Sequence, residues 1–336
     1  MPTREQLQSA TRQVDAKSIA QAVAQAKRGS SEGRVALAGA MAWVAYSCPD
    51  ACAAVCDNIA SAWLGSGPTP EIPTGLPEAP IEDSFWDAFW QVIEGPEEGY
   101  DATSITVAVA SLGAAVHPSF GDLAERHACQ HWGARNAVTR PIPDYTDIAA
   151  LEQCPTGSLG RALHAMIIEN GYDPEVLERD AIGLAELPHS LHYLNARILQ
   201  MHDVWHLVAG YETTSTNEIA ISAFQLAQFG HNYSSMFLAA VMAISTYKEP
   251  RGFTILMQII TEAWQHGQNT PVMMDIEWEA EWEHSLEDIR SRHNIPVYQS
   301  IFPADLLESV ENASLLQKLR IGWQLIRYNN RLRAAA

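Results

Sequence analysis

The stretch HDVWHLVAGYETTSTNE, residues 202–218, contains the pattern on which the fold assignment rests. Its first half is an apolar helical run, and Gly210 is typical of a helix C-terminus. The hydroxyl-rich TTST followed by Asn217 indicates a connection and the N-cap of another helix, with Glu218 in the first turn. The stretch therefore predicts two helices joined by a short turn.

Helical patterns also dominate the sequence on both sides of this stretch. Residues 4–27 form one polar amphipathic pattern, and residues 34–64 form an Ala-rich pattern that is interrupted at Pro49. From Ser158 onward the sequence predicts almost continuous helix, and no alternation is long enough to indicate a sheet. We expect an all-α fold, with many helices around a single core and an N-terminal helical extension.

A segment dense in Pro and Gly, GSGPTPEIPTGLPEAPIED, marks the one credible domain boundary. The chain of 336 residues is long enough for one large domain with an appendage. We predict an N-terminal helical extension at 1–64, a linker at 65–83 and a helical metal-binding core domain at 84–336.

The charge balance and the cysteine content restrict the partners and the compartment. The 21 Lys and Arg residues against 40 Asp and Glu residues give a net charge of -19, which argues against nucleic acid. The same charge weakens attraction to anionic lipid but leaves apolar contact with a membrane open. The chain has five cysteines and no secretory signal at the start. Its longest apolar run, Val35–Cys48, is too short to span a bilayer. These features predict a cytoplasmic protein.

Two histidines and a carboxylate share one face of the first helix in the opening stretch. Successive helical residues turn by about 100°, so His202, Asp203 and His206 point the same way. A second helix that folds back would bring Glu218 to them. Imidazole and carboxylate ligands suit zinc or a similar divalent ion. The HDxxH spacing alone is equally compatible with a hydrogen-bonded histidine pair, and Glu218 favours the metal.

These residues also carry a resemblance to a known family. His202, Asp203, His206 and Glu218 match in identity and spacing the signature of the coenzyme Q biosynthesis protein 4 family, which is HDxxH, eleven residues, then Glu. Over residues 85–295 the chain resembles this family and is identified as a bacterial homologue. The further matching features are PTGSLGRA at 155–162, Tyr193, Arg197, EIAISAFQLAQFG at 218–230 and EWEAEWEHSLEDIRSRHNI at 277–295.

The resemblance implies a metal-dependent enzyme of ubiquinone biosynthesis. It would carry out an oxidative decarboxylation that replaces the ring carboxyl of a polyprenylated 4-hydroxybenzoate-type intermediate by hydroxyl, at the metal centre of the four motif residues. Zinc is the first candidate; because zinc is redox-inert, iron or manganese are alternatives. The other reading is a non-catalytic scaffold that binds the prenyl lipid and organises other ubiquinone biosynthesis enzymes.

A prenylated substrate requires an apolar slot and contacts for its polar end. The Met-rich segments at 234–244 and 252–264 follow the site directly, and we expect Met236 and Phe237 to contact lipid, in a lid that dips into a membrane. Packing in a core is the alternative. Arg161 is a candidate for an anionic head group, or else part of a structural ion pair.

The expected partners are the prenylated quinone precursor, other ubiquinone biosynthesis enzymes, the inner face of the plasma membrane as a peripheral contact, and further copies of the chain in a homo-oligomer. In two other clusters metal binding is the less favoured interpretation: core packing is favoured for the cysteines, and a packed or surface pair for the histidines. Cys48, Cys52 and Cys56 follow each other at helical spacing, and His127 and His131 form a pair one turn apart.

Overall fold

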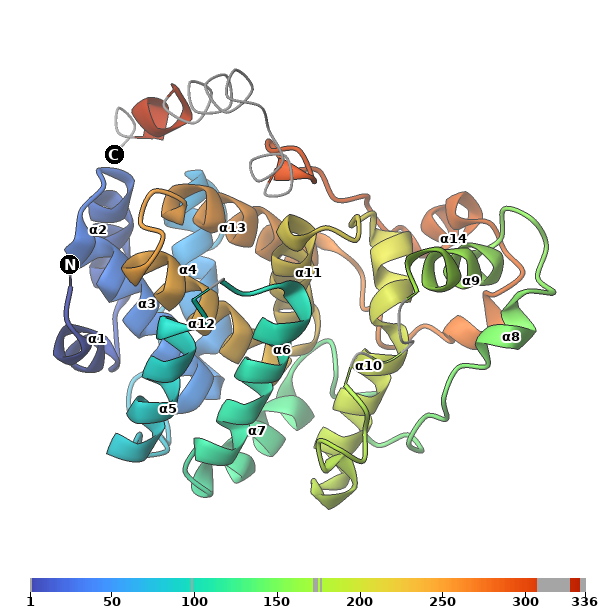
Figure 1. Ribbon diagram of the computed structural model, residues 1–336, viewed down its shortest axis with the longest axis horizontal. Helices are drawn as coiled ribbons and strands as arrows, with labels where there is room; N and C mark the ends of the chain where they lie inside the picture. The colour runs from blue at the N-terminus through green and yellow to red at the C-terminus, as the bar shows by residue number, and fades with distance from the viewer. Residues whose placement is uncertain (1, 98, 172–174, 176, 307–326, 333–336) are drawn as a thin grey trace.

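The regular elements of the computed structural model are all helices (Figure 1). No strand occurs in the described part of the chain, where one isolated antiparallel bridge joins Ser158 and Ser285. The predicted all-α fold is confirmed. The structure describes residues 2–97, 99–171, 175, 177–306 and 327–332.

Four helices come from the N-terminal part of the chain. They are α1 (Arg4–Ala10), α2 (Ala16–Lys27), α3 (Ser31–Tyr46) and α4 (Cys52–Leu64), with a 3-10 turn before the last (η1, Pro49–Ala51). The single helix predicted over 4–27 is wrong. The Asp15 carboxylate accepts the backbone N–H of Ser18 at 2.7 Å, and this N-cap begins a second helix after the break.

The N-terminal helices share one hydrophobic core with the C-terminal helices. Most of the apolar run Val35–Cys48 lies in α3, which is buried on most sides and packs along α12 (Asn232–Tyr247). Helix α4 packs against α13 (Phe253–Asn269). One buried cluster extends from Leu7 to Tyr298, as expected for a single core. The predicted division into extension, linker and core domain stays a prediction.

The middle of the chain covers one flank of this core. In Figure 1, α5 and α6 lie beside the buried α12, and α8 and α9 lie at the opposite end from α1 and α2; α7 packs against α10. The near-continuous helix predicted from Ser158 is wrong between α9 and α10 and again over residues 270–285. In both places the described residues form turns and a single short 3-10 helix. The bounds are α5 (Asp83–Glu94), α6 (Ala102–Ser111), η2 (Leu112–Ala115), α7 (Ser119–Gln130), α8 (Ile148–Leu151), α9 (Leu159–Asn170) and η3 (Leu184–Glu186).

Two consecutive helices carry the HDxxH motif and Glu218, as predicted. Helix α10 (His189–Ala209) ends at Gly210, whose φ of 80° is readily adopted only by glycine. Helix α11 (Ser215–Phe229) begins earlier than predicted, because the N-cap is Thr214 rather than Asn217. Glu218 still lies in the first turn.

An arginine of α14 holds the C-terminal end of α10. Arg290 in α14 (Leu286–His293) donates from Nε to the Val208 carbonyl at 2.8 Å and from a terminal nitrogen to the Leu207 carbonyl at 2.7 Å. These two carbonyls have no partner within their own helix, so the guanidinium satisfies them. A 3-10 turn (η4, Trp278–Ala280) precedes α14.

The described helices differ in length and apolar character. No single helix among them is both long and apolar enough to cross a bilayer. The bent pair of Thr103–Ala115 and Ser119–Gln130, at 114° to each other, meets the length and composition requirements jointly.

Candidate metal centre

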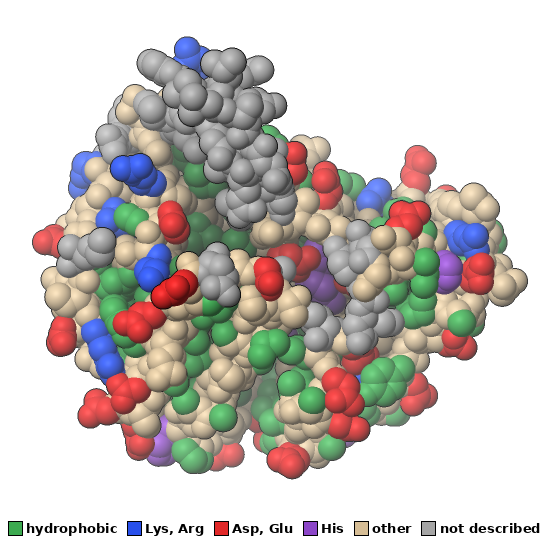
Figure 2. Space-filling view, viewed as in Figure 1, with side chains coloured by type: hydrophobic (Ala, Val, Ile, Leu, Met, Phe, Trp, Pro, Cys, Tyr) green, Lys and Arg blue, Asp and Glu red, His purple; other side chains and the backbone are tan. Residues whose placement is uncertain are grey.

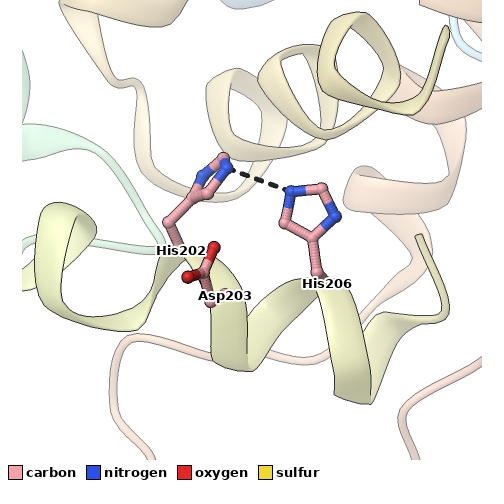
Figure 3. A group of neighbouring side chains, drawn as sticks. All are labelled: His202, Asp203 and His206. Carbon is pink, nitrogen blue, oxygen red and sulfur yellow. Dashed lines mark hydrogen bonds between the residues drawn. The ribbon is translucent and has the colours of Figure 1, made fainter. Parts of the chain in front are cut away.

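The ligand atoms predicted from the motif lie close together. His202 and His206 lie one turn apart in α10, and their Nε2 atoms are 3.0 Å apart (Figure 3). The two oxygens of Glu218, at the start of α11, lie 3.3 Å from His202 Nε2 and 3.3 Å from His206 Nε2. A carboxylate oxygen of Asp203 is within 4.8 Å of both histidine ligand atoms. The structure thus brings all four predicted residues together.

These spacings suit a small divalent cation. With zinc-to-ligand bonds near 2.0–2.1 Å and tetrahedral angles, adjacent ligand atoms are about 3.3 Å apart. The separations of 3.0 and 3.3 Å among His202, His206 and Glu218 match this value. The histidine and carboxylate donor set fits such an ion, with Asp203 directly beside it. Metal identity and the coordinating role of each residue stay predictions.

The charges at the centre favour an ionised Glu218. Burial opposes ionisation, but the two histidines outweigh it and hold the pKa of Glu218 well below its usual range. The N-terminus of α11 adds further stabilisation of the carboxylate. Burial acts to lower the pKa of His202, yet the bond to Glu218 and its charge raise it overall. Burial raises the pKa of Asp203, against the effect of the two histidines.

Tyr211 positions His206, a role that the motif spacing alone does not indicate. His206 Nδ1 lies 3.2 Å from the Tyr211 carbonyl, which can only accept, so Nδ1 carries the proton and Nε2 keeps its lone pair for a ligand. The Tyr211 hydroxyl bonds His266 Nδ1 at 2.7 Å, and its ring stacks on Tyr298 at a centroid distance of 4.4 Å. The sequence feature that could have indicated this role is the position of Tyr211, directly after the glycine that ends α10.

A cavity of about 2300 Å³ opens beside the centre. His202, Asp203 and Glu218 line it, together with apolar side chains of α6, α12 and α13. The space-filling view shows a furrow between two lobes of this face, with hydrophobic side chains on both sides (Figure 2). The centre is therefore a polar part of the wall of a mainly apolar cavity.

Two of the predicted lipid contacts line the cavity, and one predicted residue does not. Met236 and Phe237 belong to the wall, but each is only 6% exposed, so the predicted membrane-dipping lid is wrong: α12 is a central helix held by α3. Arg161 is not among the lining residues, and its guanidinium donates to the Glu152 carbonyl.

Arg197, one of the residues that carry the family resemblance, lies in an ion pair between two segments. Its guanidinium is buried and forms a two-bond ion pair with Glu279, including a contact of 3.0 Å, and also bonds Gln200 at 2.6 Å. Arg197 thereby ties α10 to the segment before α14.

The two remaining clusters pack in the core, as favoured. The Sγ atoms of Cys52 and Cys56 are 3.9 Å apart, and Cys48 is fully buried nearby in sequence. His127 bonds Asp50 through Nδ1 at 3.4 Å, and burial, followed by His127, lowers the pKa of His131 to about 3.

Fold and site together define a helical protein with a candidate metal centre in the wall of a large, mainly apolar cavity. The chain belongs to the Coq4 family: the family model for coenzyme Q (ubiquinone) biosynthesis protein Coq4 matches residues 106–299, more than half of the chain. All four residues of the centre lie within that match.

Curated relatives and a solved structure are similar over part of the chain. The mitochondrial ubiquinone biosynthesis protein COQ4 homologues of Drosophila ananassae and Danio rerio are 26% identical over 155 residues and 25% over 168 residues. These matches cover 46% and 50% of this chain, and 56% and 59% of the relatives, so the chain spans less than two thirds of their length. A crystal structure from Nostoc punctiforme PCC 73102, described as a candidate ubiquinone biosynthesis protein, is 23% identical with a TM-score of 0.48, covering 63% of this chain and 97% of that one.

Proposed function

We propose that this protein is a metal-dependent enzyme of ubiquinone biosynthesis that replaces the ring carboxyl of a polyprenylated 4-hydroxybenzoate-type intermediate by hydroxyl. The observation that carries the proposal is the donor set of His202, His206 and Glu218, with Asp203, in the wall of a cavity of about 2300 Å³. Family membership supports the pathway.

The size and lining of the cavity support a long apolar ligand. Ordinary small-molecule pockets have volumes of about 300–1000 Å³, and this cavity is more than twice as large. Its walls include Phe237, Val241 and Ile259, which offer an isoprenoid tail apolar contacts along α12 and α13. The tail would extend along these helices while the ring approaches the polar end.

The residues of the centre have separate tasks in this proposal. His202, His206 and Glu218 would hold a divalent ion, which supplies Lewis-acid stabilisation of charge on the substrate carboxylate or phenolate. Asp203 lines the cavity beside them, and its carboxylate would be the further ligand of the predicted set. The net change, ring–COOH plus water to ring–OH plus CO₂, releases two electrons and two protons, so an external acceptor such as dioxygen is required.

The test is rescue of ubiquinone synthesis in a host that lacks its own family member. Wild type should restore ubiquinone, and His206→Ala and Glu218→Ala should not, at matched levels of soluble protein. Arg161→Gln is the matched control and should rescue, because Arg161 does not line the cavity. No rescue by wild type would refute the pathway, and full rescue by His206→Ala would refute the role of the centre.

A non-catalytic prenyl-lipid scaffold is the second candidate, and the size of the cavity favours it equally. A structural metal predicts that Glu218→Ala lowers stability and lipid binding together. A catalytic metal predicts that this variant stays folded, retains the lipid and loses turnover. Both the enzyme and the scaffold proposal include contacts with other ubiquinone biosynthesis enzymes and a homo-oligomer. Both also include a cytoplasmic location with peripheral contact on the plasma membrane.

A further inference from the structure

One face of α12 lines the cavity along the whole helix. The residues of α12 and of its C-cap that belong to the cavity wall include Tyr233, Phe237, Val241, Ile244 and Lys248. They follow each other at intervals of three or four positions, and residues at this spacing share one face of a helix. Another face of α12 packs on α3, which fixes this wall in place. The cavity therefore contains a mainly apolar groove that follows these five residues, the α12 groove.

The length of the α12 groove corresponds to a definite number of isoprene units. Tyr233 and Lys248 are 15 positions apart in the sequence, which corresponds to about 22 Å along a helix. Each isoprene unit adds four carbon–carbon bonds to a tail. It spans about 5 Å when extended, because the three bonds between consecutive Cα atoms span about 3.8 Å. The groove therefore accommodates about four extended isoprene units.

The start of the α12 groove lies close to the candidate metal centre. One end of the Gln225 side-chain amide is 2.8 Å from His202 Nδ1, and its other end is 3.5 Å from Ser234 Oγ in the first turn of α12. His231, the residue before α12, bonds Asn195 of α10 at 3.1 Å. A prenyl tail on a ring held at the centre would therefore enter the groove at the first turn of α12.

The far end of the α12 groove is open to solvent. Lys248 and Glu249 line the cavity there, and both are exposed. Ile255 and Ile259 of α13, which packs against α12, add apolar wall to the groove. A tail that passes the charged end enters water, so its further units gain no burial.

A second apolar part of the cavity wall lies along α10. Leu191 and Ile198 belong to it, and Leu187 just before the helix is 37% exposed, so this part reaches the surface. The polar side chain of Asn195 separates Leu191 from Ile198 on the same helix face. The lining residues of α12 at 236–244 are all apolar. The α12 groove is therefore the better site for a hydrocarbon tail.

We propose that the α12 groove recognises about four isoprene units of the substrate tail and admits longer tails through its open end. The substrate class is then a prenylated aromatic acid with at least four isoprene units, and the protein does not distinguish among longer tails. Val241 is a specificity-determining residue, because it lies about 12 Å from Tyr233 along the helix, near the middle of the groove. The inference rests on the proposed function, which supplies the prenylated aromatic acid as the ligand.

The first experiment measures how affinity depends on tail length. 3-Polyprenyl-4-hydroxybenzoates with one to eight isoprene units compete with a fluorescent geranyl analogue for the metal-free full-length chain, below the concentrations at which they form micelles. The affinity should rise about tenfold or more with each unit up to the fourth, because each unit buries further apolar carbons. Units beyond the fifth should each change it less than about twofold. A rise that continues evenly to the eighth unit, or that ends at the second, would refute the proposal.

Added bulk in the groove tests the direction of the tail. Val241 is 7% exposed and lines the cavity, so Val241→Trp should block the groove after about two units, and longer tails should bind no better than a two-unit tail. Ile244 lies about 16 Å from Tyr233 along the helix, so Ile244→Trp should move this limit to about three units. Leu191→Trp is the matched control in the α10 part of the wall and should keep the wild-type profile. A shortened profile for Leu191→Trp, or an unchanged profile for either folded α12 variant, would overturn the proposal.

The rescue of ubiquinone synthesis separates this proposal from the proposed function, because tail binding is measured without metal and without turnover. Circular dichroism shows that each variant is folded. If the affinity levels off at about four units but wild type does not rescue, the enzymatic function fails and the tail site stands. If wild type rescues while the affinity rises evenly to eight units, the length limit is wrong and the function stands.

Discussion

Substitution of Gly267 by Ala should destabilise the protein, although Ala is the better helix former. Gly267 lies in the last turns of α13, where this helix packs against α11, which carries Glu218 and Gln225. A Cβ atom there would lie 2.7 Å from the Ala227 Cβ and 2.9 Å from the Phe224 carbonyl oxygen. Both separations are too short, so one helix must move.

The expected magnitude is the difference of two opposing effects. Ala in place of Gly stabilises a helix by roughly 0.5–1 kcal/mol, whereas an extra methyl in a packed core destabilises by about 1–3 kcal/mol. The backbone of α11 cannot yield as a flexible side chain would. The free energy of unfolding should therefore fall by about 0.5–2 kcal/mol.

Urea unfolding followed by circular dichroism measures this effect against a matched glycine. Gly121 is exposed in α7, and no described atom lies within 4 Å of the Cβ that Ala would add there. Gly121→Ala should therefore leave the midpoint unchanged or raise it, and Gly267→Ala should lower it. A midpoint for Gly267→Ala at or above that of Gly121→Ala would refute the packing argument.

Three further predictions concern the centre, the pH response and the ion pair of α10. Zinc at a hundred times its Kd should stabilise wild type by about 2.7 kcal/mol, which a thermal melt shows as a rise in Tm. Glu218→Gln should lose most of this rise. An unchanged rise in Tm would exclude Glu218 as a ligand. The depressed pKa of His131, about 3 against 6.5 when unfolded, gives stability that is complete above pH 6.5 and lost as the pH falls. Each pH unit in that window lowers the free energy of unfolding by about 1.4 kcal/mol. In urea titrations between pH 6.5 and 4.5, the free energy of unfolding of His131→Gln should therefore fall less steeply with pH than that of wild type. Equal slopes for the two proteins would contradict this. Glu279→Gln should destabilise the protein more than Arg197→Met in the same assay. The Arg197 side chain is 6% exposed and that of Glu279 is 50% exposed, so Glu279→Gln leaves the buried Arg197 charge unpaired. A larger loss of stability for Arg197→Met would contradict this prediction.

Local patterns sufficed for the all-α class, for the pair α10 and α11, and for the composition of the centre. The spacing of His202, Asp203 and His206 and the Gly210 terminator are short-range features, so the sequence alone indicates them. The predicted single helix at 4–27 failed because the Asp15 cap competes with helix continuation. Exposure of Met236 was also mispredicted, since an apolar residue gives the same signal in a core helix and in a lid.

The sequence by itself determined that the chain is helical, that it is acidic, and that two imidazoles and a carboxylate share one helix face. The tertiary structure decided which groups meet across helices. It brought Glu218 within 3.3 Å of both histidines, placed the Tyr211 carbonyl at His206 and the Gln225 amide at His202, and kept Arg161 out of the cavity wall. These contacts depend on how α10, α11 and α12 pack. Helix periodicity fixes the direction in which a residue points from its own helix, but it does not fix which residue of another helix it meets.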